Sequence, residues 1–394
     1  MRRIAFVIPW YGPDILGGAE AEARRTAERL CQAGLPVEVL TTCVRDLRAD
    51  WGLNYHRPGV VEINGVMVRR FPVRKRDRAA FDAVNWKLMH NQPVTPAEEQ
   101  IFVHENVCSP ALVDYIGKHQ DEYIFIFIPY MFGTTYWGIA ACKGKALLIP
   151  CLHDESYARM GVFRQMFTWV QRLIFLSPAE MELACSLYPW VDEVAVLIGG
   201  GVDTDFTADG EAFRHTYGVT APFILYAGRK DHGKNVDLLV DYFRRYQAHR
   251  SNAVELVLIG GGALPVEVNH HAGIKDLGFV PLQEKYNAYA AATILCQPSL
   301  KESFSLVLME AWIAGTPALV HAGCAVTREH CQRSNGGLYF ADYSEFEACL
   351  DLLLSHPALR AALGANGRRY VMENYRWDII VERYCRLLNG MRFR

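Results

Sequence analysis

Residues 223–235 read FILYAGRKDHGKN, an apolar run that leads directly into a loop rich in basic side chains. A short, continuously apolar run predicts a strand that is buried on both faces. A helical pattern follows from Val236. A strand, a polar loop and a helix in this order form the repeating unit of parallel α/β sheets. The stretch therefore predicts an α/β fold with a basic loop at the carboxyl end of a strand.

The same unit recurs along the 394-residue chain in two series. In the first series, apolar runs predict strands at residues 4–9, 37–42, 60–63, 66–71, 123–128, 146–150, 173–176 and 194–198. In the second series, they predict strands at residues 223–227, 254–259, 294–297 and 318–321. Asn64-Gly65, between two of these runs, predicts a hairpin turn. The two series indicate two doubly wound, Rossmann-like domains that face a cleft.

The break between the two series lies in residues 199–222, which are rich in Gly and Thr and lack a long apolar run. Such a composition is typical of a linker. We therefore expect an N-terminal domain over residues 1–200, a linker over 201–222 and a C-terminal domain over 223–375. A helix from about residue 376 to 394 is expected to pack back on the N-terminal domain.

The composition argues against several classes of protein. A formal net charge of −2 disfavours nucleic acid as a partner. No apolar stretch reaches the ~20 residues of a membrane-spanning helix. The first apolar run is too short for a signal peptide, so we expect a cytoplasmic protein. The 11 cysteines lack C-x-x-C pairs, and no metal site is expected.

The loop after residue 227 has the G-x-x-x-x-G-K spacing of a phosphate-binding P-loop, from Gly228 to Lys234. A P-loop needs Ser or Thr after the lysine to hold magnesium, and Asn235 stands there instead. The strands that follow also lack a terminal aspartate. Another interpretation is that Arg229 and Lys234 present two fixed positive charges to a diphosphate. A third interpretation is a basic loop that faces solvent and binds no ligand.

Residues 301–317, KESFSLVLMEAWIAGTP, predict a helix that is apolar on nearly every face and contains Glu310. A buried carboxylate is costly unless it is paired, so Glu310 either pairs inside the protein or binds a polar ligand. A carboxylate can accept hydrogen bonds from both hydroxyls of a ribose. Residues at the helix start offer free N–H groups that can hold a phosphate. These residues are Ser303, Phe304, Ser305 and Leu306.

Three further loops follow predicted strands. Gly17-Gly18 opens the first long helix, where glycine lets the backbone approach a ligand closely. His153 follows the strand at 146–150 and so lies at the sheet edge where ligands bind in such folds. Gly261 is the middle residue of a glycine run that could also bring backbone near a ligand. A structural turn is the alternative for each loop.

In this order the motifs resemble those of the retaining glycosyltransferases of family 4, which have the GT-B fold. The resemblance spans nearly the full chain. It is carried by G-G-A-E at 17–20, H-D at 153–154, S-P-A-E at 177–180, G-V-D at 201–203, G-R at 228–229, K-N at 234–235, E-x7-E at 302–310 and G-T-P at 315–317.

The resemblance implies roles for the donor-side residues. Arg229 and Lys234 would neutralise the donor diphosphate. Glu310 would bind the ribose, and Glu302 with the backbone after it would contact the donor sugar and phosphate. The nucleotide-sugar is a co-substrate, and the resemblance implies no cofactor and no catalytic metal ion.

The resemblance also implies a role for the N-terminal loops. His153 would lie at the reaction centre, so that the catalytic set becomes His153, Glu302, Arg229 and Lys234. The Gly17-Gly18 loop would line the cleft between donor and acceptor. The N-terminal domain would take the acceptor, and the anomeric configuration of the sugar would be retained.

Two departures qualify the resemblance. The family often has E-G-F-G where this chain has E-S-F-S at 302–305, which leaves the identity of the donor sugar open. Asp203-Thr204-Asp205 matches the D-x-D metal motif of the other large glycosyltransferase fold. Because it enters the predicted linker directly after glycines, we expect a structural turn there.

One segment of the first half is strongly basic, with only Asp77 opposing it. Its basic residues are Arg69, Arg70, Arg74, Lys75, Arg76 and Arg78. Such clusters attract anionic lipid headgroups, whereas a solvated charged loop is the alternative. We hypothesise a peripheral enzyme at the inner face of a membrane that extends a lipid-linked glycan.

The favoured hypothesis is transfer of a sugar from a GDP- or UDP-sugar to a glycan acceptor, lipid-linked, in bacterial-type surface polysaccharide or glycolipid assembly. Three alternatives stay open. One is a GT-B epimerase that acts on a nucleotide-sugar without an acceptor. The second is a P-loop nucleotidase or kinase. The third is a protein that binds a sugar or a nucleotide without catalysing a reaction.

Overall fold

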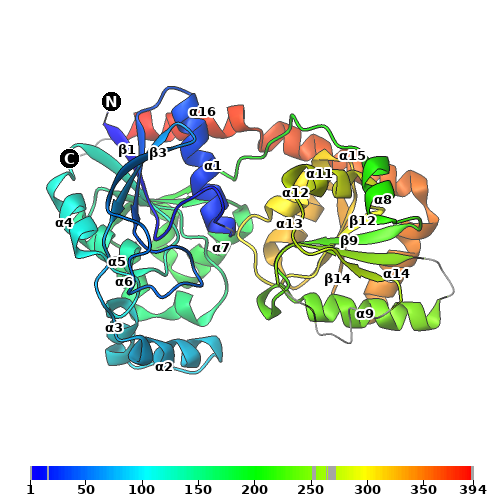
Figure 1. The fold of residues 1–394 in the computed structure, drawn as a ribbon, viewed down its shortest axis with the longest axis horizontal. Coiled ribbons are helices and arrows are strands. Elements are labelled where there is room, and N and C mark those ends of the chain that lie inside the picture. The colour runs from blue at the N-terminus through cyan, green and yellow to red at the C-terminus, as the bar shows by residue number, and fades with distance from the viewer. Residues whose placement is uncertain (1, 16, 251–253, 263, 265–271, 392–394) are drawn as a thin grey trace. The chain divides into compact units, whose positions relative to one another are not determined.

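The structure is a computed structural model that describes residues 2–15, 17–250, 254–262, 264 and 272–391. The chain divides into two compact units. Unit 1 comprises residues 1–201 and 380–394, and unit 2 comprises residues 202–379. Each unit has its own sheet with helices packed against it (Figure 1), which confirms the predicted α/β class.

The sheet of unit 1 has eight strands in the order β3-β4-β2-β1-β5-β6-β7-β8. The strands are β1 (Arg3–Val7), β2 (Val37–Thr42), β3 (Gly59–Ile63), β4 (Val66–Phe71), β5 (Tyr123–Phe127), β6 (Ala146–Leu148), β7 (Val170–Phe175) and β8 (Ala195–Leu197). Every neighbouring pair is parallel except the hairpin β3–β4. At its turn Asn64 and Gly65 have φ of 51° and 81°, so the predicted hairpin is confirmed.

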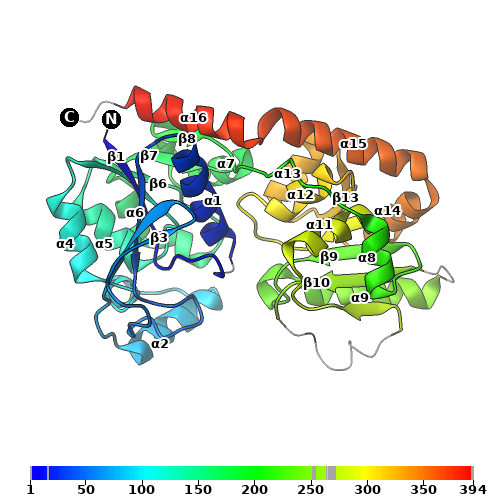
Figure 2. The same cartoon turned by 45° about the horizontal axis from the view of Figure 1, so that its top comes forward.

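The helices of unit 1 lie on both faces of this sheet. They are α1 (Gly18–Gln32), α2 (Arg78–Met89), α3 (Pro96–His104), α4 (Pro110–Lys118), α5 (Gly133–Ala141), α6 (Gly161–Phe167) and α7 (Pro178–Leu187). Figures 1 and 2 show α4 and α5 on one face and α1 on the other. Several helices begin as the sequence dictates. The Thr95 and Ser109 side chains, for example, accept from backbone N–H groups of the first turns of α3 and α4.

The last helix, α16 (Trp377–Gly390), begins in unit 2 and continues into unit 1 from Ile380. Figure 2 shows it beside β8, and the Arg383 guanidinium donates to the Ile198 carbonyl oxygen at 2.6 Å. Tyr384 on the same helix is fully buried. The part of α16 that belongs to unit 1 is therefore held by a side-chain hydrogen bond and by the buried side chains of Ile380, Tyr384 and Leu388.

The sheet of unit 2 has six parallel strands in the order β11-β10-β9-β12-β13-β14. The strands are β9 (Phe223–Ala227), β10 (Glu255–Ile259), β11 (Ile274–Asp276), β12 (Ile294–Gln297), β13 (Ala318–His321) and β14 (Gly337–Phe340). The helices are α8 (Gly210–Tyr217), α9 (Val236–His249), α11 (Leu282–Ala291), α12 (Leu306–Ile313), α13 (Ala325–Ser334), α14 (Tyr343–Ser355) and α15 (Pro357–Asn374). Figure 1 shows α9 and α14 on one face of the sheet and α11 and α12 on the other.

Residues 202–222, which the sequence predicts to be a linker, belong to unit 2 instead. They contain α8, which the Asp209 side chain caps and which ends at Gly218 in a left-handed conformation. Phe213 on this helix is fully buried, and its ring centroid lies 6.0 Å from that of Phe223. An eight-residue helix with one buried residue is too short for its hydrophobic pattern to distinguish it from a loop.

Within the described ranges, no helix combines the length and the apolar character that crossing a membrane requires.

Candidate functional site

The topology of unit 2 brings two predicted loops together. β9 lies between β10 and β12. The loops that follow β9 and β12, residues 228–235 and 298–305, therefore leave the same edge of the sheet side by side. The Asn235 side chain donates to the Pro298 carbonyl oxygen at 3.1 Å, which ties the two loops to each other.

Lys234 and Glu302 form an ion pair across these loops. The Lys234 Nζ lies 2.7 Å from Glu302 Oε1, and the side chains are 24% and 10% exposed. Gln297 Nε2 donates to the same carboxylate oxygen at 3.0 Å. A partly exposed ammonium of this kind can exchange its carboxylate partner for a phosphate oxygen. The freed carboxylate can then accept from a sugar hydroxyl.

Arg229 lies in the first of the two loops and is more exposed than Lys234. Its Nε lies 3.5 Å from Asp231 Oδ2, and its side chain is 44% exposed. The Tyr226 hydroxyl donates to the Arg229 carbonyl oxygen at 2.6 Å, which fixes the backbone of the residue. The backbone of Arg229 is therefore fixed while its guanidinium faces solvent, an arrangement that suits binding of an oxyanion.

Glu310 is buried in α12 with 2% of its surface exposed. Its Oε2 accepts from the Tyr289 hydroxyl at 3.0 Å and lies 2.8 Å from Lys285 Nζ. The carboxylate is therefore paired inside unit 2, one of the two outcomes that the sequence left open. Lys285 and Tyr289 were missed at the sequence level. Their spacing of four residues places them on one face of α11, which was the only signal available.

The chain between Glu302 and Glu310 is held at Phe304. This ring is buried and lies edge-on to Tyr375 and His330, at centroid distances of 5.0 Å and 5.6 Å. Ser305 has φ of 67°, a left-handed conformation that glycine adopts more readily than serine. The backbone of the E-S-F-S segment thus has the shape that a glycine would give, and Leu306 begins α12 directly after it.

The glycine run after β10 is explained by close backbone approach. A Cβ atom on Gly260 would lie 2.0 Å from the carbonyl oxygen of Gly228. The Gly261 carbonyl oxygen accepts from the backbone N–H of Lys230 at 2.7 Å. The Lys230 ammonium is fully buried and contacts the Gly260 carbonyl oxygen at 2.5 Å and Asp276 Oδ1 at 2.8 Å. Lys230 therefore holds the loops after β9 and β10 together.

Truncation of Lys230 to alanine is expected to lower the free energy of unfolding of unit 2 by about 3 kcal/mol, because it leaves a largely buried Asp276 carboxylate without its ammonium. Denaturant unfolding of the variant measures this loss. Arg244, an exposed cation on α9, supplies the matched control in Arg244→Ala. A loss below about 1 kcal/mol, the level of a surface ion pair, would contradict the structural role.

The other predicted site residues lie in unit 1. His153 follows β6, and its Nδ1 is 3.9 Å from Glu155 Oε1 with the side chain 28% exposed. Gly17 precedes α1 with φ of 155°, and a Cβ atom there would lie 1.9 Å from the Glu20 carboxylate. Glu20 accepts from the Trp10 indole N–H at 2.7 Å. The positive φ of Gly17 favours glycine there, whereas the Glu20 carboxylate ends a flexible side chain that could move away from a Cβ atom. Gly18 is the first residue of the helix.

Two buried carboxylates lie behind these loops, Glu22 on α1 and Glu180 on α7. Burial raises the pKa of Glu22 to about 7, and the hydrogen bond from Thr26 lowers it only in part. Burial, and to a smaller extent the charge of Glu22, raise the pKa of Glu180, whereas its backbone hydrogen bonds lower it. Both carboxyl groups therefore cost more to ionise in the folded protein than in water.

Unit 1 is expected to lose stability as pH rises from about 4.5 to about 7, because the unfolded Glu22 ionises freely over this range and the folded one does not. Glu22→Gln removes this penalty. Near pH 4.5 the variant and the parent should have the same free energy of unfolding. At pH 8 the variant should be more stable by up to ~3 kcal/mol, because each unit of pKa shift corresponds to ~1.36 kcal/mol. Denaturant unfolding at both pH values tests the prediction, with exposed Glu182→Gln as control. The prediction would be contradicted if the free energy of unfolding changed equally with pH in the parent and the variant.

The D-x-D match takes part in an internal contact. Asp203 Oδ1 accepts from the Trp377 indole N–H at 2.8 Å, within unit 2. In the part of the chain that the structure describes, histidine, cysteine, aspartate and glutamate side chains form no group of three or more that could hold a metal ion.

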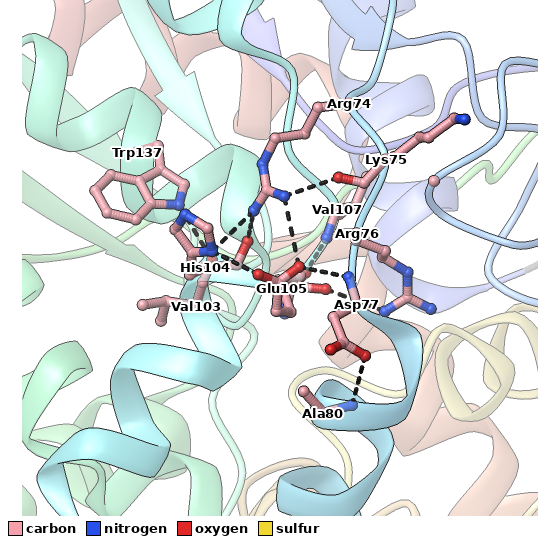
Figure 3. Close-up of polar contacts among 12 residues, drawn as sticks. Arg74, Lys75, Arg76, Asp77, Ala80, Val103, His104, Glu105, Val107 and Trp137 are labelled. Carbon is pink, nitrogen blue, oxygen red and sulfur yellow. Dashed lines mark hydrogen bonds and ion pairs between the residues drawn. The ribbon is translucent and has the colours of Figure 1, made fainter.

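The basic segment is largely engaged inside unit 1 (Figure 3). Arg74 donates to the carbonyl oxygens of His104 and Lys75 and faces the Glu105 carboxylate at 3.5 Å. Arg76 donates to the Glu105 carbonyl oxygen at 3.1 Å. Its guanidinium also lies over the rings of Trp51 and Phe81.

Two more guanidinium groups of the basic segment have partners inside unit 1. Arg69 pairs with Glu38 at 2.9 Å, and Arg70 is buried and donates to the Tyr11 carbonyl oxygen at 2.8 Å. The exposed basic residues are Lys75 and Arg78, and Arg78 forms a solvent-exposed pair with Asp82 at 3.3 Å. The six-charge patch that the sequence predicts is thus reduced to two, because its acidic and carbonyl partners come from distant parts of the chain.

Comparisons with known proteins agree with this geometry. The family described as glycosyl transferases group 1 matches residues 211–370, within unit 2. An uncharacterized glycosyltransferase of Methanocaldococcus jannaschii is 24% identical over 403 residues, which cover 96% of each chain. The D-inositol 3-phosphate glycosyltransferase of Xylanimonas cellulosilytica is 33% identical over 256 residues, 59% of this chain and 60% of that protein.

A solved structure extends the likeness to the whole fold. The Anabaena protein HepE in complex with UDP-glucose has a TM-score of 0.70 to this chain at 15% identity, over 99% of this chain and 100% of that one. Residues 211–370 therefore resemble the group 1 glycosyltransferases, and the two parallel-sheet units share the GT-B fold of solved glycosyltransferase structures.

Proposed function

We propose that the protein transfers a sugar from a nucleotide-sugar to a glycan acceptor, with retention of the anomeric configuration and without a metal ion. The observation that carries the proposal is the Lys234–Glu302 ion pair at the carboxyl ends of β9 and β12, with Glu310 following in α12. The order of motifs, which resembles that of the retaining family 4 enzymes, supports retention.

The chemistry of the leaving group explains how the reaction can proceed without a metal. Cleavage of the bond to the sugar leaves negative charge on the diphosphate. Lys234 and Arg229 offer fixed positive charge at the sheet edge, and the first N–H groups of α12 add a partial positive charge. Glu310 would accept from the ribose hydroxyls. His153 would act at the donor sugar.

The P-loop alternative loses support from the position of Asn235. In a P-loop this position holds the magnesium ligand. Here Asn235 has φ of 56° and its side chain is engaged with Pro298 in the neighbouring loop. The loop before it, His232–Lys234, forms a short 3-10 turn.

The complex of HepE with UDP-glucose supports a UDP-sugar as the first donor to test, with GDP-sugars beside it. The experiment is a thermal-shift panel of UDP, GDP, ADP, TDP, CMP, their sugar conjugates and ATP with magnesium. A ligand at 100 times its Kd stabilises by ~2.7 kcal/mol. One nucleoside diphosphate should stabilise in the presence of EDTA. Stabilisation by ATP with magnesium alone would overturn the proposal.

We further propose a lipid-linked acceptor and a membrane contact, now centred on α2 rather than on all six basic residues. Lys75 and Arg78 are exposed beside its start, and Trp86 and Met89 on the same helix are 53% and 66% exposed. Two basic residues near anionic headgroups contribute about 2 kcal/mol together. Exposed aromatic and apolar side chains add burial in the interface.

The variant Lys75→Gln/Arg78→Gln is therefore expected to bind phosphatidylglycerol vesicles about 30-fold more weakly than the parent, as ~2 kcal/mol implies. Co-sedimentation measures the difference, and phosphatidylcholine vesicles should bind both proteins equally weakly. Lys118→Gln, at the end of α4, is the control for charge alone. Equal sedimentation of variant and parent with anionic vesicles would rule out this surface.

A further inference from the structure

Glu180 connects two strand ends in unit 1. It lies on α7, and its residue is 1% exposed. Its Oε1 accepts from the backbone N–H of Leu152 at 2.6 Å, and its Oε2 accepts from that of Leu176 at 2.9 Å. Leu152 follows β6 and Leu176 follows β7, which are parallel neighbours in the sheet. One side chain therefore fixes the exits of two adjacent strands.

The first of these contacts lies one residue before His153. Cys151, on the other side of Leu152, has φ of 52°, a left-handed conformation that residues other than glycine adopt only when their surroundings impose it. The hydrogen bond from the Leu152 N–H to Glu180 can impose this conformation, because the bond is short and buried. The His153 side chain is 28% exposed, and its Nδ1 lies 3.9 Å from Glu155 Oε1.

We propose that Glu180 is a positioning residue that sets the location of His153 through the Leu152 N–H. The second hydrogen bond, to Leu176, fixes the carboxylate so that it cannot follow movements of the loop. The inference rests on the proposed function, in which His153 acts at the donor sugar. It gives a role to the S-P-A-E run at residues 177–180, to which the sequence assigns none.

Glu180→Gln tests the proposal with little change of shape. Glutamine keeps one acceptor oxygen, but its NH2 group faces the other backbone N–H. The turnover number for sugar transfer is expected to fall about 10- to 100-fold, since small misplacements of a catalytic group have effects of this size. The KM for the donor and the Kd for the nucleoside diphosphate should stay unchanged, because Lys234 and Glu310 lie in the other unit.

A double-mutant cycle separates positioning from general support of the fold. In a His153→Ala background, adding Glu180→Gln should reduce turnover less than twofold further, because the group that Glu180 positions is already gone. A further loss equal to that in the parent would overturn the proposal. Glu182→Gln, an exposed glutamate two residues along α7, should leave turnover unchanged in both backgrounds.

A readout independent of activity is the NMR signal of the His153 imidazole. Glu180→Gln should move this signal, whereas the signal of His119, at the end of α4 in the same unit, should stay in place. An unmoved His153 signal overturns the proposal. If Glu180→Gln does not fold, Glu180→Asp serves instead, because it keeps the carboxyl group but is too short to reach both N–H groups. A parent protein that transfers no sugar would refute the proposed function, whereas the NMR comparison would still test this inference.

Discussion

Glu310→Gln is expected to weaken binding of the cognate nucleoside diphosphate about 100-fold and to remove the preference for ribose over 2′-deoxyribose. A carboxylate that accepts from a hydroxyl contributes ~1.5–3 kcal/mol per hydrogen bond, about 10- to 150-fold in affinity. In the parent, the 2′-deoxy analogue should therefore bind at least tenfold more weakly. In the variant, the two ligands should bind with nearly equal affinity.

The surroundings of Glu310 make this contrast specific. Lys285 and Tyr289 hold the carboxylate in one place, so the ribose would meet an acceptor that is already oriented. Calorimetric titration with each ligand gives the four affinities. Glu373→Gln, an exposed glutamate on α15, is the matched control. Retained discrimination against the 2′-deoxy ligand in the Glu310 variant would show that the ribose binds elsewhere.

Lys234→Gln is expected to lower the turnover number for sugar transfer between about 100- and 1000-fold, the range seen when one group that stabilises developing charge is removed. The Lys234 ammonium lies 2.7 Å from Glu302, so the charge is already fixed at the strand ends before a substrate arrives. The variant loses that charge and leaves the Glu302 carboxylate without its ammonium partner.

Binding experiments separate this effect from damage to the fold. The variant should lose affinity for the nucleoside diphosphate but keep its affinity for the bare nucleoside, because only the phosphates meet Lys234. Arg244→Gln, an exposed cation on α9, should change neither quantity. Equal losses for the nucleoside and the diphosphate would place Lys234 away from the phosphates.

Much of the fold could be predicted because its signals are local. Continuous apolar runs marked the strands except β11 and β14, which were not predicted, and Asn64-Gly65 marked the hairpin turn. Strand order was needed to bring Lys234 and Glu302 together, and the doubly wound pattern supplied it by rule. The sequence also singled out Glu310 as a buried charge in need of a partner, but it did not identify Lys285 as that partner.

What the sequence could not predict depends on contacts between distant segments. The basic residues Arg69, Arg74 and Arg76 looked like a free cluster, because their acidic and carbonyl partners are far away in sequence. The link from Glu180 to Leu152 spans 28 residues and joins a helix to a loop. Neither the composition nor the periodicity of a segment carries information of this kind.

Sugar transfer in the presence of EDTA tests the proposed metal-independent, retaining reaction directly. The protein is incubated with UDP-glucose or GDP-mannose and a panel of glycoside and lipid-linked acceptors, and proton NMR records the released nucleoside diphosphate and the anomeric signal of the product. We expect release of a nucleoside diphosphate and an α-linked product from the α-linked donor. A β-linked product, an absolute need for magnesium, or turnover of ATP alone would contradict it.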